Sequence, residues 1–524
     1  MALWSSLALV GLFVIWALAS PASMSGAMDA MLAFSTRSFG WFYLWVVFAL
    51  VLVCFFLVFS RYGNIRLGGD DERPAYDRKS WFSMLFAAGM GIGLMFWGVA
   101  EPVSHYLQPP PGVEPVTAAA ANASMRYTFF HWGLHPWAIY CTFGLAVAFF
   151  QFRRQAPMTI SSTLGGLPER WRGKWIVIVD ILALVATAFG IATSLGFGAM
   201  QINSGLAQLF GIPVGPTSQI IIIVCATIAF LASALSGLDR GVKLLSNINL
   251  VIALALAAVV FIVGPTAAIL DTLTTSLGGY ISEFVRMSLR LTPFTGGGWF
   301  ADWTIFYWAW WIAWAPYVGL FIARISRGRT IREFLIGAMF VPALTCFVWF
   351  AIFGGSALHF DIFQNAGIGQ AALKEPSSAL FMLFDYLPMK ALLSGVATLL
   401  VVVFFVTSGD SGVFVMGVIS NGGKGDPSAR LKLVWGILIA LIAIALLLAG
   451  GLEAVQAMTI LMALPFTVVL VIVVSSVLRA ISQDQAEIDE TEEALHRALH
   501  SQEVRDIVKQ HLRARAGKAP DDPR

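Results

Sequence analysis

The densest group of chemically distinctive side chains lies between Trp303 and Pro316, where five tryptophans fall within twelve residues. At about 100° per residue, six of its aromatic side chains share an arc of about 140° on one helix face: Trp303, Phe306, Tyr307, Trp310, Trp311 and Trp314. A belt of tryptophans at a membrane surface occupies one level, whereas this face continues for about 17 Å along the helix. Such depth favours a surface that lines a ligand. Pro316, which lacks a backbone donor, predicts a break in the helix.

A second aromatic group contains Trp132, Trp137 and Tyr140, which also share about 140° of helix surface. His131 and His135 beside them have the spacing of a metal-binding pair. No third ligand of a suitable type is evident, and a proline directly after His135 distorts the spacing. We therefore interpret the two histidines as packed residues near the outer end of a helix.

The faces of aromatic rings attract cations. A quaternary ammonium group suits them well, because it has no conventional hydrogen-bond donor and is easily removed from water. If the two tryptophan groups face each other, they predict a ligand that carries a trimethylammonium group.

The segment from Ala87 to Gly98 is unusually rich in glycine, with Gly89, Gly91, Gly93 and Gly98. Each glycine weakens a helix by about 1 kcal/mol relative to alanine. Two interpretations stay open: close packing between helices, or an unwound stretch whose backbone groups bind an ion or a substrate. A nucleotide site is excluded, because no strand precedes the segment and no Lys-Ser or Lys-Thr follows it.

A polar group interrupts another apolar stretch at Thr407, Ser408, Gly409 and Asp410. Its hydroxyls and backbone carbonyls would suit a hard cation such as Na⁺. The alternative is that the hydroxyls bond back to their own helix, which is frequent.

The composition shows which elements must position these residues. Of the 524 residues, 58% are hydrophobic and 12% are charged, against about 25% charged in soluble proteins. These values exclude a soluble globular protein, a disordered chain and a nucleic-acid binder. A membrane-crossing helix needs about 20 apolar residues. We predict twelve: Leu3–Ala19, Phe39–Phe59, Trp81–Val99, Tyr127–Phe152, Trp175–Gln201, Thr217–Leu235, Ile248–Leu270, Trp303–Ile322, Phe334–Phe353, Ala391–Val418, Leu433–Leu452 and Ala457–Val477.

The distribution of basic residues predicts the orientation. The connections after even-numbered spans, together with the segment after the last span, hold 27 of the 33 lysines and arginines. Basic residues concentrate on the cytoplasmic side, so both termini are expected there. An ion channel, a membrane-embedded enzyme and a primary pump are disfavoured, because the sequence shows no charge rings, no nucleophile–base or metal set and no nucleotide loop.

Three segments outside the spans are informative. Asp271–Leu291 has the mixed polarity of an amphipathic helix on the outer face. Gly354–Pro388 is polar enough for an external loop with short helices. Leu478–Arg524 is expected to form a cytoplasmic tail with an acidic first part. It holds eight basic and ten acidic residues, which makes attachment to anionic lipids through net charge weak.

Several motifs together resemble the betaine/choline/carnitine transporter family. They extend over roughly residues 37–480 and comprise Gly89 to Phe96, Glu101-Pro102, His131 to Tyr140, Trp303 to Trp314, Ala323 to Arg329 and Thr407 to Asp410. The resemblance implies an all-α leucine-transporter-type fold of twelve transmembrane helices, a homotrimer, and a multi-pass location among the lipids of a bacterial inner membrane. Residues 1–80 would add two helices and a basic loop, 81–270 and 303–477 would be inverted five-helix repeats, 271–302 would connect them, and 478–524 would be the tail.

The resemblance also implies the site residues. An aromatic box would hold the substrate, with Phe306 on its path and the backbone of Gly91 and Gly93 meeting the substrate's carboxylate. The box residues are Trp132, Trp137, Tyr140, Trp310, Trp311 and Trp314. One Na⁺ would be bound by carbonyls of Ala87, Met90 and Phe404 and by the hydroxyls of Thr407 and Ser408. A second Na⁺ site in relatives uses two threonines, which here match Thr187 and Ile191. Isoleucine cannot coordinate a cation, so the number of coupling ions stays open.

The predicted function is import of a quaternary-ammonium zwitterion, with glycine betaine as the expected substrate, by Na⁺ symport and alternating access. Some choline carriers place an aspartate at the position of Gly93, and its absence here favours a zwitterionic osmoprotectant. Choline, carnitine, ectoine and dimethylsulfoniopropionate stay as alternatives, as does Na⁺-independent exchange. No organic cofactor and no nucleic-acid partner are expected.

Overall fold

The computed structural model describes residues 2–89, 91–236, 239–294, 298–423 and 426–516. Within these ranges the regular structure is helical, apart from one isolated β-bridge between Arg66 and Thr330. The first half contains α1 (Ala2–Ala19), α2 (Pro21–Phe59), α3 (Arg78–Gly89), α4 (Ile92–Leu107), α5 (Ala118–Trp132), α6 (Leu134–Ala148), α7 (Glu169–Phe210), α8 (Pro216–Ser236), α9 (Asp239–Val263), α10 (Thr266–Ser282) and α11 (Phe284–Ser288). The second half contains α12 (Phe306–Ile325), α13 (Ile331–Gln364), α14 (Ile368–Lys374), α15 (Ala379–Phe384), α16 (Lys390–Ser420), α17 (Ala429–Gly450) and α18 (Leu452–Ala516).

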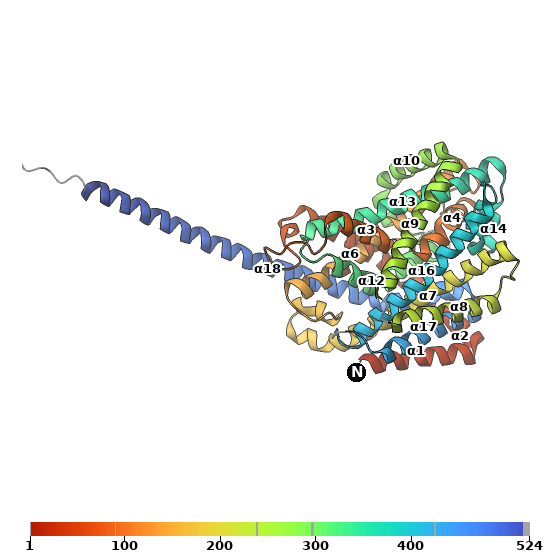
Figure 1. Ribbon diagram of the computed structural model, residues 1–524, viewed down its shortest axis with the longest axis horizontal. Coiled ribbons are helices and arrows are strands. Elements are labelled where there is room, and N and C mark those ends of the chain that lie inside the picture. Colours follow the sequence, from red (N-terminus) through yellow and green to blue (C-terminus); the bar gives the residue numbers. More distant parts are fainter. Residues whose placement is uncertain (1, 90, 237–238, 295–297, 424–425, 517–524) are drawn as a thin grey trace, which may run out of the picture.

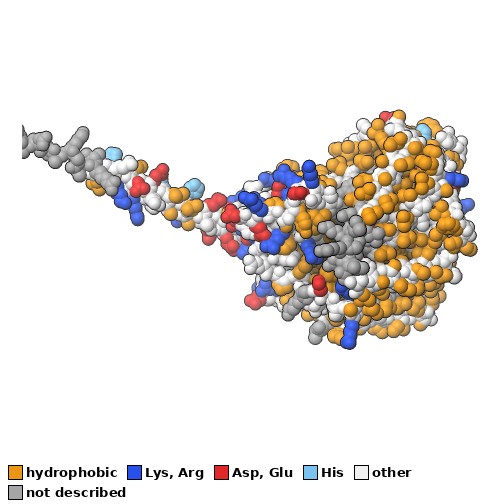
Figure 2. Space-filling model, viewed as in Figure 1, with side chains coloured by type: hydrophobic (Ala, Val, Ile, Leu, Met, Phe, Trp, Pro, Cys, Tyr) orange, Lys and Arg blue, Asp and Glu red, His pale blue; other side chains and the backbone are white. Residues whose placement is uncertain are grey.

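The helices confirm an all-α polytopic membrane protein. Among the described residues, ten helical segments are long and apolar enough to cross a membrane, and α9 with α10 adds an eleventh if that bent pair is one span. The remaining predicted span, Trp81–Val99, is divided between α3 and α4, and neither half reaches 18 residues. Hydrophobic side chains cover most of the visible face of the bundle (Figure 2), as expected for contact with lipid.

Several predicted boundaries are wrong, including the start of the second span, because α2 begins at Pro21 and not at Phe39. The seventh span does not continue to Leu270: the chain bends by 109° between α9 and α10, because Pro265 lacks a backbone donor and disfavours a helical residue before it. The connecting helix α10 therefore begins at Thr266 and not at Asp271. The ninth span passes Phe353 and ends only at Gln364, where Asn365 adopts a left-handed conformation with φ 53°.

A further correction concerns the tail. It is not separate from the last span, since α18 continues from Leu452 to Ala516 as one helix of 65 residues. The sequence has no glycine or proline between Pro465 and Gly517, so nothing in it interrupts the helix. Figure 1 shows the second half of α18 projecting from the bundle.

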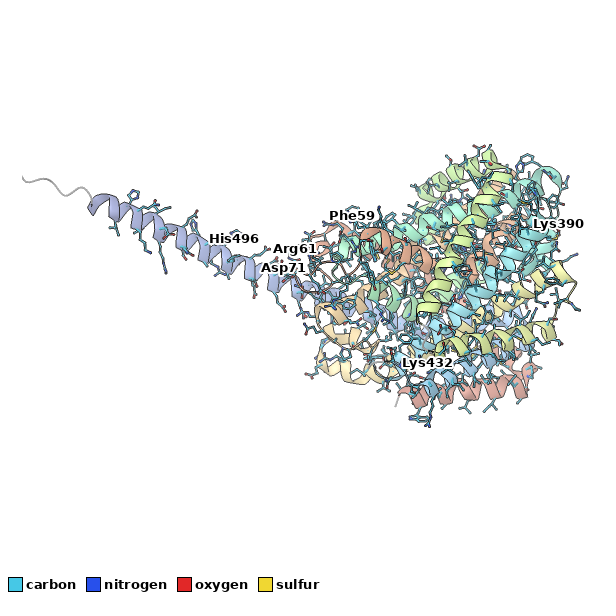
Figure 3. All side chains as sticks on the ribbon, in the orientation of Figure 1. Phe59, Arg61, Asp71, Lys390, Lys432 and His496 are labelled. Carbon is cyan, nitrogen blue, oxygen red and sulfur yellow. The ribbon has the colours of Figure 1, made fainter. Side chains whose placement is uncertain are left out.

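Ion pairs fix α18 at the point where it leaves the bundle. Asp484 forms ion pairs with two arginines that follow α6. Its carboxylate lies 3.0 Å from Arg153 Nε and 3.3 Å from Arg154 Nη2. Farther along, Asp489 Oδ2 lies 2.8 Å from Arg61 Nη1. Figure 2 shows charged side chains gathered in this region, and Figure 3 labels Arg61 there and His496 on the projecting part.

We expect Asp484→Asn to loosen this junction by about 2 kcal/mol, because its side chain is only 4% exposed and its loss leaves Arg153 partly uncompensated. Asp489→Asn is the matched control. Its pair with Arg61 is far more exposed and should contribute about 0.5 kcal/mol or less. Hydrogen exchange of the amides around residue 484 measures the local opening. Equal exchange rates in the two variants would contradict this account of the anchor.

Candidate functional site

Helices α5, α6 and α12 bring five aromatic side chains together. We call Trp132, Trp137, Tyr140, Trp310 and Trp311 the aromatic cluster. The ring of Trp311 is central: its centroid lies 5.6 Å from that of Trp132, 5.5 Å from Trp137 and 4.8 Å from Tyr140. Trp310 meets Trp132 edge-on at 6.0 Å. All five side chains are buried, so a bound cation would be shielded from water. The attraction between a cation and a ring face is strongest in such a desolvated site.

A local break allows α5 and α6 to contribute together. The stretch predicted as one helix is divided at Gly133, which has φ −92° and ψ −138°. A Cβ atom at this position would lie 2.5 Å from the carbonyl oxygen of Phe129. Glycine is therefore required, and Trp132 closes α5 while Trp137 lies in the first turn of α6.

The structure places the two remaining aromatic candidates differently. Phe306 stacks on Trp310 with 5.8 Å between centroids and an interplanar angle of 13°, so it extends the cluster along α12. Trp314 lies apart. Its indole nitrogen donates to the carbonyl of Gly190 on α7 at 2.8 Å, and its ring packs on Tyr317. Among the described ring contacts, none joins Trp314 to the cluster.

Helix α12 does not break at Pro316, so that prediction is wrong. It continues through Pro316 to Ile325, and its irregular part is instead the π-helical turn Ala301–Ile305 that precedes it. A proline is tolerated within a membrane helix when neighbouring segments satisfy the freed backbone groups.

The glycine-rich segment is interrupted as the second interpretation predicted. α3 ends at Gly89, α4 begins at Ile92, and Gly91 between them is extended with φ −168° and ψ −173°. The N-cap residue Gly91 has no side chain that could cap α4, so in the described part of the chain its first backbone N–H groups can bind a negatively charged group.

Gly93 connects this helix start to the aromatic cluster. A Cβ atom on Gly93 would lie 2.7 Å from Cη2 of Trp310 and 2.9 Å from Cη2 of Trp132. The two indoles thus rest directly on the α4 backbone. A ligand with a cationic head on the rings and an anionic end at the helix start would meet complementary charge at both ends.

The candidate cation ligands lie mainly on α16. The hydroxyl of Thr407 donates to the carbonyl of Val403 at 2.9 Å and lies 3.3 Å from that of Phe404. Thr407 therefore bonds back to its own helix, which is the alternative stated from the sequence. The oxygen of such a hydroxyl still keeps lone pairs that could bind a cation. Ser408 is half-buried on the same helix. Met90 lies outside the described residues, as does the side chain of Ala87.

The other polar candidates have separate environments. Asp410 accepts a hydrogen bond from Ser233 on α8 at 2.9 Å. Thr187 on α7 is buried, and its hydroxyl has no hydrogen-bond partner among the described residues. Ile191, one turn later, is also buried and contacts Gly412 of α16. A hydroxyl and an apolar side chain therefore occupy the position of the second candidate ion site.

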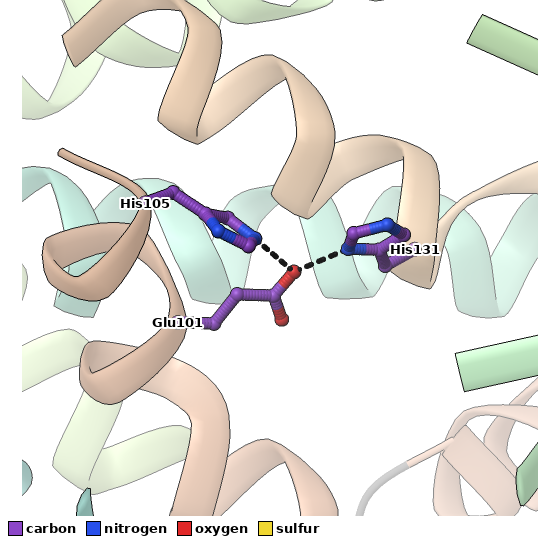
Figure 4. Close-up of side chains that lie close together, drawn as sticks. All are labelled: Glu101, His105 and His131. Atoms are coloured by element: carbon purple, nitrogen blue, oxygen red, sulfur yellow. Dashed lines mark hydrogen bonds and ion pairs between the residues drawn. The ribbon is translucent and has the colours of Figure 1, made fainter. Parts of the chain in front are cut away.

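One functional candidate was missed at the sequence level. Glu101 on α4 is completely buried, and Figure 4 shows its carboxylate between His105 and His131. Its Oε2 atom also accepts hydrogen bonds from Trp132 at 2.8 Å and Tyr307 at 2.5 Å. The available signal was a glutamate in an apolar helix, which in a membrane protein indicates function by default. His131 and His135, which we interpreted from the sequence as packed residues and not as a metal-binding pair, are both buried, and His135 bonds Ser288 at 2.7 Å.

Comparison with known proteins shows the family to which the chain belongs. Residues 1–486 match the model of the BCCT, the betaine/carnitine/choline family of transporters. The chain is 47% identical over 492 residues to the glycine betaine transporter OpuD of Bacillus subtilis, covering 93% of this chain and 96% of that protein. It is 43% identical over 487 residues to an ectoine/hydroxyectoine transporter of Virgibacillus pantothenticus (92% and 97% covered). It is 42% identical over 493 residues to a glycine betaine transporter of Acinetobacter baylyi (94% and 74% covered).

These relatives support a role in transport and not in enzymatic catalysis. A family match over almost the whole chain, together with the helical membrane architecture, shows that the chain belongs to the betaine/carnitine/choline transporter family.

Proposed function

We propose that the protein imports glycine betaine by Na⁺ symport. The observation that carries the proposal is the contact between the aromatic cluster and the free start of α4 at Gly93. The trimethylammonium group would rest against the rings, and the carboxylate would bind the first N–H groups of α4. The buried indole nitrogens of Trp310 and Trp311, which have no hydrogen-bond partner among the described residues, would add donors.

The transport cycle would proceed by alternating access. Substrate enters from outside and is desolvated against the rings, and the inverted repeats then rock to open the site inward. Na⁺ would supply positive charge to α16 and the interrupted α3–α4 segment, stabilising the substrate-loaded form. We further propose a homotrimer in the bacterial inner membrane, with both termini in the cytoplasm.

A second candidate substrate is ectoine, because the Virgibacillus relative is named for ectoine and hydroxyectoine at 43% identity. Ectoine is also zwitterionic, but its delocalised cation has no methyl groups on nitrogen. Tryptophan fluorescence with betaine, choline, carnitine and ectoine, each with and without Na⁺, separates these ligands. We expect the tightest binding for betaine with Na⁺. Binding of betaine that ignores Na⁺ would favour an exchanger, which the isoleucine at position 191 also leaves open.

The Na⁺ assignment makes its own prediction. Thr407→Ala should raise the half-saturating Na⁺ concentration for betaine binding roughly tenfold, because one ligand of the ion is lost. Thr398→Ala is the control, since Thr398 bonds its own helix at Ser394 O in the same way, more than two turns earlier on α16. If both variants respond to Na⁺ as the unmodified protein does, Thr407 is not an ion ligand.

A further inference from the structure

Glu101 holds a buried carboxyl group to which the proposed transport cycle gives no role. Its side chain is fully buried, and Glu101 is the one buried glutamate among the described residues. In the described structure no lysine or arginine pairs with it. A buried charge of this kind is costly unless partners compensate it, so its neighbours show what it does.

The four hydrogen-bond partners of Glu101 can all act as donors, which is what an ionised carboxylate requires. Trp132 can only donate, and the Tyr307 hydroxyl lies on the same oxygen. On the other oxygen, His131 Nδ1 lies at 2.7 Å and His105 Nε2 at 3.2 Å. The second nitrogen of His131 lies 2.9 Å from the Thr304 hydroxyl, which can donate to it. With a proton on His131 Nδ1 and on His105 Nε2, two histidines, a tyrosine and a tryptophan supply four donors to one carboxylate.

A metal ion is the rival interpretation of this group, because a carboxylate and two histidine nitrogens lie within 4.8 Å of one another. Two ligands of one tetrahedral zinc, each about 2.0–2.1 Å from the ion, lie about 3.3 Å apart. The 2.7 Å between Glu101 and His131 is instead a hydrogen-bond length. Direct hydrogen bonds therefore account for the geometry better.

Trp132 joins this carboxylate to the aromatic cluster. The Nε1 atom of its indole bonds Glu101, while the far edge of the same ring system rests on Gly93 and meets Trp310. Tyr307 also contacts both, since its hydroxyl bonds Glu101 and its ring lies 5.6 Å from that of Trp132. One indole thus separates the negative charge from the surface on which a ligand cation would rest.

We propose that Glu101 is a specificity-determining residue: its ionised carboxylate orients Trp132 and Tyr307 and provides the negative charge that the ligand's quaternary ammonium compensates. The inference rests on the proposed function, because it takes the aromatic cluster as the binding surface. The inference also bears on the choice of substrate, for which the sequence analysis used the absence of a carboxylate at position 93. A carboxylate does serve this cluster, although it lies behind Trp132 and not at position 93.

The test compares two ligands of the same shape, glycine betaine and 3,3-dimethylbutanoate. They share the carboxylate and three methyl groups, but the second has a neutral carbon in place of the ammonium nitrogen. The dissociation constant of the carbon analogue divided by that of glycine betaine measures the preference that is due to the positive charge. Glu101→Gln preserves the size of the side chain and should reduce this ratio roughly tenfold. This is the loss expected when an attraction between two charges in a partly buried environment is removed.

Two variants separate charge from shape. Tyr307→Phe removes one donor and keeps the charge, so it should weaken both ligands alike and leave the ratio within about threefold. Glu101→Asp should also keep the ratio. A ratio that Glu101→Gln leaves unchanged would overturn the inference, while the proposed function would stand. If the unmodified protein fails to prefer betaine over its carbon analogue, the aromatic site itself is wrong and both proposals fall.

A measurement on the unmodified protein covers the case in which Glu101→Gln does not fold. With ¹³C-labelled glutamate, betaine binding should perturb the infrared band of an ionised carboxylate. Perturbation of a protonated carboxyl band, or of no glutamate band, would overturn the inference.

Discussion

Replacing Trp311 with leucine is expected to weaken the binding of glycine betaine about 30-fold. The ring of Trp311 contacts three other members of the aromatic cluster, so it lies at the centre of the proposed cation site. A desolvated contact between a cation and an aromatic face contributes about 2 kcal/mol, which corresponds to a factor of roughly 30. Titration of purified protein, monitored by tryptophan fluorescence, measures the dissociation constant.

Trp308→Leu is the matched control for this prediction. Trp308 belongs to the same helix and is equally buried, but its ring contacts Phe130, His131 and His135 outside the cluster. Loss of a buried tryptophan should lower the thermal stability of both variants by a similar amount. Only Trp311→Leu should change the affinity of the folded fraction by more than about threefold. Equal affinity losses would indicate a general packing defect and contradict the assignment.

The second large effect is expected for Gly93→Ala. The added methyl group would lie 2.7 Å from Trp310 and 2.9 Å from Trp132, closer than carbon atoms approach. Rigid indoles cannot yield without leaving the positions in which they contact the cluster, and overpacking of this kind costs about 1–3 kcal/mol. We expect betaine affinity to fall at least tenfold, measured in the same titration.

Gly91→Ala provides the comparison two residues earlier. No atom of the described residues lies within 4 Å of a Cβ atom there, and the extended backbone suits any residue. Its loss of affinity should be several-fold smaller than that of Gly93→Ala. If the two substitutions have the same effect, crowding of the indoles is not what glycine prevents at position 93.

The sequence predicts most of the helices because length and apolar composition are local properties. The interruption at Gly91 is also local, since closely spaced glycines weaken a helix without help from tertiary contacts. The bend at Pro265 and the continuous α18 are local as well and were readable in principle. The predicted ends of these segments differ from the observed ones because hydropathy alone sets the ends of a predicted span. The helix itself ends where the backbone geometry changes.

The arrangement of the site depends on contacts between distant segments, which no local pattern contains. Helical spacing correctly puts Trp310 and Trp314 on a similar face of α12, but it cannot tell that Trp314 reaches α7 instead of the cluster. Likewise, Glu101 is 206 residues from Tyr307, so the partners that hold its charge appear only in the fold. The aromatic chemistry and a glutamate within an apolar helix can both be read from the sequence, whereas the partners that surround that glutamate cannot.

Uptake into proteoliposomes tests the central claim most directly. Purified protein is reconstituted, the vesicles are loaded without Na⁺, and entry of labelled glycine betaine is followed after an inward Na⁺ gradient is imposed. The account predicts accumulation above the external concentration, which collapses when an ionophore dissipates the gradient. Betaine entry at the same rate and to the same level with and without the gradient would contradict it.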